Sequence, residues 1–235
     1  MLSLKFRLGL FEAPMRLDGD KAEALADSQD TDSLACEAAR QSIVLLKNEN
    51  NFLPLRIGQH KKIAVIGPNA AVCRLGNYSG MPRHTVSPFE GIRDCVGNQA
   101  TVVHAEGCKI AKNDTGSSYK NWRYVDEVKF VSVEQNRPLI AEAVKTAQDA
   151  DLVVLALGDN VLLSREAWGE NHIGDRTSFE LTASQQELAS QVISTGKPVV
   201  LVLNNGKPVV LNNAASNIPA VLTLHYAGQQ TGTAL

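Results

Sequence analysis

Two glutamates flank a tryptophan in the segment SREAWGENHIGDR, residues 164–176. Glu166 and Glu170 each lie two residues from Trp168. A carboxyl group beside an aromatic ring can be partly desolvated, so that it keeps its proton near neutral pH and can act as a general acid. The alternative is that both glutamates are solvated surface acids, which is the commoner state of this residue type.

The same segment carries other groups that could do chemistry. Asp175 and Arg176 could bind a substrate, but an ion pair that holds the loop in place is the better interpretation. Ser164 and His172 lack the G-x-S-x-G context of a nucleophilic serine. In LGNYSGMP, residues 75–82, Tyr78 could stack on a sugar or simply belong to a turn.

The position of residues 164–176 favours a functional role. They follow DLVVLALG, residues 151–158, which is typical of a buried strand, and Thr182, where the next helix is expected to begin, lies 24 positions after Gly158. Connections in α/β proteins usually take about 2–6 residues, and loops longer than about 12–15 residues are commonly functional. Ligand sites in open parallel sheets lie beyond the carboxyl ends of the strands. The sequence therefore predicts a site in this loop.

The surrounding pattern alternates between helical and strand periodicity. A helix is expected over 31–47, with Thr31 or Asp32 as N-cap; a second helix is expected from Pro138 to 150; and a third is expected after Thr182, with Thr182 and Gln185 as a capping box. Residues 108–133 are expected to be irregular. The runs expected to be buried strands are 61–67, 101–107, 151–158, 198–206, 207–211 and 219–226. This order predicts an α/β fold, with an open, mainly parallel sheet between helices on both faces, an α/β sandwich of flavodoxin-like layering.

Composition excludes several classes of protein. The 235 residues carry a formal net charge of -2 without long runs of either sign, which argues against nucleic acid or a membrane surface as partner. VIGPNAA, residues 65–71, has one glycine where a dinucleotide fingerprint needs three, so a Rossmann-like nucleotide binder is the weakest hypothesis. The four cysteines are isolated from one another, so no metal site and no cofactor are expected.

A set of segments in a fixed order carries a resemblance to a known family. They are KFRLGLFEAP, AARQSIVLLKNENNFLPL, KKIAVIGPNA, LGNYSG, SPFEGI, DADLVVLALG, GDRTSFELTASQQEL, TGKPVVLVLNNGKPV and GQQTGTAL. Together they resemble the C-terminal α/β sandwich domain of glycoside hydrolase family 3, the β-glucosidases and β-xylosidases. The resemblance covers nearly the whole chain and is weakest at residues 108–133.

The resemblance implies a division of labour between two domains. Family members of this kind are retaining, exo-acting glycosidases that remove terminal β-D-glucosyl or xylosyl residues from oligosaccharides and glycosides. A barrel domain supplies the aspartate nucleophile, and a loop of the sandwich supplies the acid/base glutamate. The family's S-D-W-like nucleophile motif is absent from residues 1–235. Residues 1–30 resemble the end of the barrel and the interdomain linker, and 31–235 resemble a sandwich that is incomplete at its C-terminus. The chain alone is therefore expected to be inactive.

The site residues follow position by position. Many members have S-G-E-G-Y followed by G-D-R, and residues 164–168 with 174–176 align best with this pattern. Glu166 is therefore the expected acid/base and Glu170 the alternative, with Trp168 and Tyr78 as substrate contacts and Asp175 and Arg176 as loop-structuring residues. Arg165 and Ala167 stand where the family has glycines, which leaves the register open. Family habit favours a periplasmic or secreted protein. The competing hypothesis is a non-catalytic carbohydrate-binding or scaffolding module.

Overall fold

The computed structural model describes residues 1–12, 18–76, 78–112, 114, 128–167, 175–211 and 216–235. The chain divides into two compact units, residues 1–34 and 35–235. In the first unit, α1 (Leu2–Arg7) precedes α2 (Gly19–Ala26), whose N-cap Asp18 accepts a hydrogen bond from the Lys21 amide at 3.1 Å. The next helix, α3 (Gln29–Ser42), crosses the boundary between the units.

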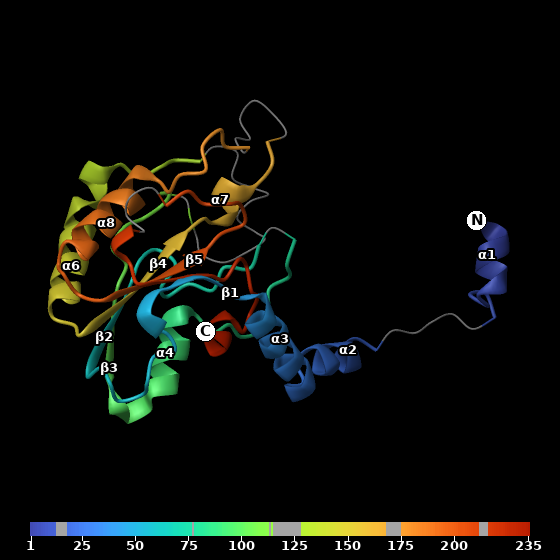
Figure 1. The fold of residues 1–235 in the computed structure, drawn as a ribbon. Coiled ribbons are helices and arrows are strands. Elements are labelled where there is room, and N and C mark those ends of the chain that lie inside the picture. The colour runs from blue at the N-terminus through green and yellow to red at the C-terminus, as the bar shows by residue number, and fades with distance from the viewer. Residues whose placement is uncertain (13–17, 77, 113, 115–127, 168–174, 212–215) are drawn as a thin grey trace. The chain divides into compact units, whose positions relative to one another are not determined.

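The second unit is built on a six-stranded sheet with the order β1-β6-β5-β4-β2-β3. All neighbouring strands are parallel except β1, which runs antiparallel to β6. This confirms the predicted open, mainly parallel sheet, and Figure 1 shows its strands with the helices around them. The strands are β1 (Val44–Asn48), β2 (Lys62–Ile66), β3 (Thr101–Ala105), β4 (Leu152–Gly158), β5 (Val199–Asn204) and β6 (Ala220–Thr223).

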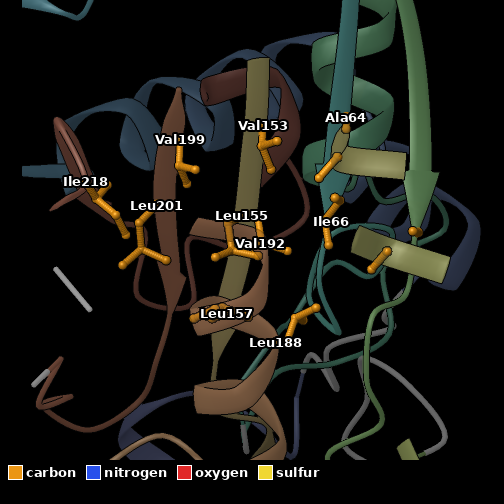
Figure 2. Packing of buried hydrophobic residues seen from close by; sticks show 14 of the residues in the cluster. Ala64, Ile66, Val153, Leu155, Leu157, Leu188, Val192, Val199, Leu201 and Ile218 are labelled. Atoms are coloured by element: carbon orange, nitrogen blue, oxygen red, sulfur yellow. The ribbon is translucent and has the colours of Figure 1, made fainter. Parts of the chain in front are cut away.

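One face of the sheet is covered by α6 (Val133–Gln148) and α8 (Ala183–Ile193), which pack against each other. Alternate residues of the central strands point into this layer, because successive side chains of a strand face opposite sides. Leu155 and Leu201 meet Leu188 and Val192 of α8 in one buried cluster (Figure 2). These strands are buried on both faces, which explains their continuous apolar sequences.

The other face carries α4 (Pro88–Val96) and α9 (Thr231–Ala234), which pack on each other. A capping box begins α4, in which Ser87 and Glu90 exchange hydrogen bonds. The intervening strand residues, such as Val65 and Val202, form the second core cluster here. Helices therefore lie on both faces of the sheet, as the α/β sandwich requires. This unit also contains two short 3-10 helices, η1 (Glu49–Asn51) and η2 (Gly97–Gln99).

Three expected elements are wrong in extent or type. The helix expected over 31–47 ends at Ser42, and Val44–Asn48 instead form strand β1. The apolar run gains hydrogen bonds from β6, a distant partner that local helical periodicity does not reveal. The next helix begins at Val133 rather than Pro138, because Ser132 and Gln135 form a capping box. The run 207–211 is not a buried strand: Val210 makes one isolated bridge to Glu180 and is 49% exposed.

Candidate functional site

A short helix places Glu166 at the carboxyl edge of the sheet. After β4 the chain forms α7 (Val161–Ser164), which the sequence did not predict, and three of its residues are buried. The Asn160 side chain begins this helix by accepting a hydrogen bond from the Leu163 amide at 3.1 Å. Glu166 follows two residues after α7 and is exposed, whereas its neighbour Arg165 is 1% exposed. Trp168 and Glu170, together with His172, lie outside the described residues.

Asp175 closes the base of this loop. Its amide donates to the Arg165 carbonyl at 3.1 Å, and its Oδ2 accepts from the Ala167 amide at 3.0 Å. The two residues on either side of Glu166 are thus both bonded to Asp175. Its φ of 44° lies in the left-handed region, which aspartate tolerates better than most residues. The structure therefore brings two of the predicted site positions, Glu166 and Asp175, together.

Arg176 adds an ion pair to the same edge. Its Nη1 lies 3.7 Å from Oδ1 of Asp159, and its Nη2 donates to the Glu180 carbonyl at 2.8 Å. On the other side, Nζ of Lys207 lies 4.0 Å from Oδ1 of Asp175. Two acids and two bases from three separate segments therefore form one charged group.

Asp159 is the buried member of this group, with 5% of its surface exposed. Burial raises its pKa to about 6, although the charges of Arg176 and Lys207 and a hydrogen bond from the Lys207 amide act in the opposite direction. A carboxyl group with such a pKa at the end of a strand is typical of functional sites. Asp159 was not among the predicted site residues, although its place directly after Gly158 was a usable signal.

Tyr226, which follows β6, is a contact point for three loops. Its hydroxyl lies 3.0 Å from Oγ of Ser164, at the end of α7. Its ring lies so close to Gly76 and Gly206 that a Cβ on either glycine would press on it. Burial is the main cause that raises the pKa of the phenol, so it stays a neutral hydrogen-bonding group. Tyr226 was also missed, because its partners are distant in sequence.

The predicted substrate contact Tyr78 lies on the same segment as Gly76, one of the two glycines close to the Tyr226 ring. It is 83% exposed, two residues beyond Gly76, on the segment that follows β2. On the same segment, Arg74 forms a buried ion pair with Asp114, in which Nη2 and Oδ2 are 3.0 Å apart. Asn160 donates to the same oxygen of Asp114 at 2.9 Å. This cluster ties the loop after β2 to Asn160, the residue that begins α7.

Gln185 has a different role from the one its spacing predicts. No side-chain hydrogen bond of the capping-box kind is made by Thr182 at the start of α8. Instead, the buried amide of Gln185 accepts from the Gly158 N–H at 2.8 Å and donates to the Gly158 carbonyl at 2.9 Å. Gly158 has a φ of 131°, and a Cβ there would collide with the Asn204 carbonyl. The carboxyl end of β4 is therefore fixed by its neighbours on two sides.

The remaining features lie away from Glu166. An apolar cavity of about 660 Å³ lies on the α4 and α9 side, lined by Val154, Val200 and Leu222 among others, and no predicted site residue lines it. Among the residues placed by the structure, no cluster of three or more His, Cys, Asp or Glu could hold a metal ion. Within that same part of the chain, none of the helices has both the length and the apolar character needed to cross a bilayer.

Comparisons with known proteins complete the description. The family model described as "Glycosyl hydrolase family 3 C-terminal domain" matches residues 43–235. A β-xylosidase of Formosa agariphila is 36% identical, in a match that covers 100% of this chain and 30% of the relative. A periplasmic β-glucosidase of Salmonella typhimurium is 34% identical with the same coverage, 100% and 30%.

A solved structure is similar as well. The β-glucosidase EmGH1 of Erythrobacter marinus superimposes with a TM-score of 0.88 and 41% identity, over 99% of this chain and 31% of that one. The chain thus spans about 30% of the length of the relatives it matches.

Proposed function

The chain belongs to glycoside hydrolase family 3, in which it represents the C-terminal domain, and from this we propose that it supplies the acid/base glutamate of a retaining exo-acting β-glycosidase. In this proposal Glu166 is the acid/base, and an aspartate of a preceding barrel domain is the nucleophile. The substrate is a terminal β-D-glucosyl or xylosyl residue of an oligosaccharide or glycoside.

One observation carries the choice of Glu166. Asp175 bonds to the backbone of both neighbours of Glu166, through the Arg165 carbonyl and the Ala167 amide, so the segment has a fixed base while the carboxyl group itself stays exposed. An acid that must reach a sugar held by another domain needs this combination of a held backbone and a free side chain. Asp175 and Arg176 act in the proposal as loop-structuring residues.

The chemistry uses two carboxyl groups about 5–5.5 Å apart. The aspartate attacks the anomeric carbon while Glu166 gives its proton to the departing glycosidic oxygen, which leaves as an alcohol. Glu166, now a carboxylate, then removes a proton from water, and the water oxygen displaces the aspartate from the sugar. The anomeric configuration is retained because it is inverted twice. Trp168 and Tyr78 are proposed to contact the sugar or its leaving group.

Leaving groups of different basicity test this role. The chain is joined to a family barrel that carries the aspartate, and Glu166 is replaced by alanine. Without an acid, substrates with poor leaving groups should lose about 10²–10⁴ in kcat/KM, whereas a dinitrophenyl β-glucoside, which needs no proton, should lose far less. The measurement is kcat/KM against the pKa of the leaving group.

Glu170→Ala is the matched control, because this glutamate is four residues away in the same loop. In Glu170→Ala, kcat/KM should depend on the pKa of the leaving group as little as it does in the native enzyme, which is the flat dependence. A steep dependence in Glu170→Ala together with a flat one in Glu166→Ala would transfer the role to Glu170. A flat dependence in both, with activity retained, would favour the non-catalytic carbohydrate-binding or scaffolding module instead.

A further inference from the structure

The backbone of Asp159 is held by the neighbouring strand, independently of the contacts that its side chain makes. Its amide donates to the Asn204 carbonyl at 2.7 Å, which extends the pairing of β4 with β5 by one residue. The preceding Gly158 is held by the Gln185 amide group on the opposite side. A carboxyl group in such a place can serve as a rigid reference for neighbouring loops, because sites built on strands are more precisely placed than sites on loops.

The side chain of Asp159 interacts with two segments, the end of the Glu166 loop and the segment that follows β5. The Arg176 guanidinium approaches from the returning end of the loop, and the Lys207 amide and ammonium approach from the segment after β5. Both cations are about a quarter exposed, 24% for Arg176 and 25% for Lys207, whereas the Asp159 side chain is 8% exposed. The acid is therefore the buried member of the group, and both cations are partly exposed to solvent.

From these cations the contacts lead to the backbone on either side of Glu166. Lys207 reaches one oxygen of Asp175, and the other oxygen of Asp175 accepts the Ala167 amide. Arg176 is covalently next to Asp175, so its pairing with Asp159 also restricts where Asp175 lies. The pairs Arg176–Asp159 and Lys207–Asp175 and the Ala167–Asp175 hydrogen bond are all within 4.0 Å.

We propose that Asp159 is the positioning residue of the Glu166 segment, here residues 164–167 with 175–176: its ionised carboxylate holds Arg176 and Lys207, and through them it keeps Asp175 bonded beside Glu166. The meaning of this position rests on the proposed function of Glu166. Asp159 touches no reacting atom in this scheme and is a positioning residue rather than a catalytic one.

The energetics favour a positioning role over a stabilising one. Burial raises the pKa of Asp159 to about 6, so the protein as a whole holds the neutral form better than the charged one. A buried acid whose ionised form is disfavoured does not contribute to stability at neutral pH. Asp159 also interacts electrostatically with the Tyr226 phenol. The charges of Arg74 and Asp114 act on the pKa of the same phenol. The substitution Asp159→Asn would remove the charge while keeping the size and the acceptor for the Lys207 amide.

Amide hydrogen exchange of the 235-residue chain, followed by NMR, tests the proposal without any substrate. The probes are the amides of Ala167 and Asp175, which donate the two hydrogen bonds at the base of the loop. In Asp159→Asn at pH 7.5 both should exchange about five- to tenfold faster than in the native chain, while core amides such as Val154 exchange no faster than in the native chain. Asp151→Asn, at the opposite end of β4, is the matched control and should leave both probes unchanged.

The pH dependence separates positioning from simple packing. Rates are divided by those of an unstructured peptide at the same pH. In the native chain, protection of Ala167 and Asp175 should fall as the pH is lowered from about 7.5 to about 5, and in Asp159→Asn it should stay flat. A transition that persists in Asp159→Asn comes from another group and contradicts the proposal.

A second variant covers the case in which Asp159→Asn does not fold. Arg176→Gln removes the same contact from a partly exposed side chain, and it should speed exchange at both probes, whereas Arg176→Lys should restore part of the protection. Unchanged probes in a folded Asp159→Asn or Arg176→Gln overturn the proposal. Because no hydrolysis is measured, such a result leaves the assignment of Glu166 standing, and a failed assignment of Glu166 leaves this result unaffected.

Discussion

Asp159 and Asp151 stand at the two ends of one strand, and their environments shift their pKa values in opposite directions. Burial raises the pKa of Asp159, whereas hydrogen bonds from the Lys62 and Lys61 amides lower the pKa of the exposed Asp151. The raised pKa means that the folded chain binds the Asp159 proton more tightly than the unfolded chain does. Its contribution to stability is therefore present below pH 3.8 and is lost as the pH rises through about 6.

This difference predicts how Asp159→Asn changes the free energy of unfolding. Between about pH 4 and pH 7 the variant should gain on the native chain by up to about 3 kcal/mol, because a pKa difference of about 2 corresponds to that energy. For Asp151→Asn the sign should be reversed, since the variant loses an acid that is better ionised in the folded chain. Urea unfolding at several pH values measures both. Parallel curves for the native chain and Asp159→Asn would show that the buried carboxyl group does not titrate as described.

At the scale of elements, the contact between Gln185 of α8 and the carboxyl end of β4 fixes the position at which the site loop begins. Gln185 is fully buried, and its side-chain amide satisfies both backbone groups of Gly158. Gln185→Leu keeps the bulk but leaves a buried N–H and a buried carbonyl without this partner. Each such group costs about 1–3 kcal/mol, so the variant should lose about 2–6 kcal/mol of unfolding free energy at pH 7.

Gln191→Leu is the control on the same helix. Gln191 donates to Glu187 in an exposed pair at 2.6 Å, and its loss should change stability by less than about 0.5 kcal/mol. Equal losses for the two glutamine variants would contradict the role given to Gln185, as would a stable Gln185→Leu chain. Urea unfolding at pH 7 is again the measurement.

The strands were predicted correctly where their burial on both faces is visible in the local sequence. Strands β2, β4 and β5 are continuous apolar runs, because they are buried on both faces, and this property is local and visible. Strand β1 was missed because its apolar residues also fit a helical period, and its pairing with β6 comes from residues about 175 positions away. For the same reason Gln185 was interpreted as a capping residue.

The candidate site was predictable in place but not in composition. A long polar loop after β4 could be selected from its length and position, and Glu166 and Asp175 lie in it. Asp159, Lys207 and Tyr226 could not be joined to it, because they follow three different strands and meet only when the sheet forms. Sequence spacing reports neighbours along the chain, whereas an α/β site is assembled from neighbours across the sheet.

At the scale of the whole molecule, the proposal divides one reaction between two domains. The chain covers about 30% of the relatives it matches, and the proposed nucleophile belongs to the barrel. The purified 235-residue chain should therefore not hydrolyse an aryl β-glucoside, since an acid without its nucleophile lacks most of the catalytic machinery. This inactive chain is also the control for the measurement below.

The most direct test of Glu166 as acid/base is the product that Glu166→Ala forms with azide, in the chain joined to a family barrel. Azide attacks the sugar on the barrel aspartate and needs no base, so it replaces the missing carboxylate. With dinitrophenyl β-glucoside, azide should raise the turnover of Glu166→Ala by about tenfold or more and yield β-glucosyl azide, identified by NMR. No such product should come from Glu170→Ala. If Glu170→Ala forms β-glucosyl azide and Glu166→Ala does not, the central claim is wrong.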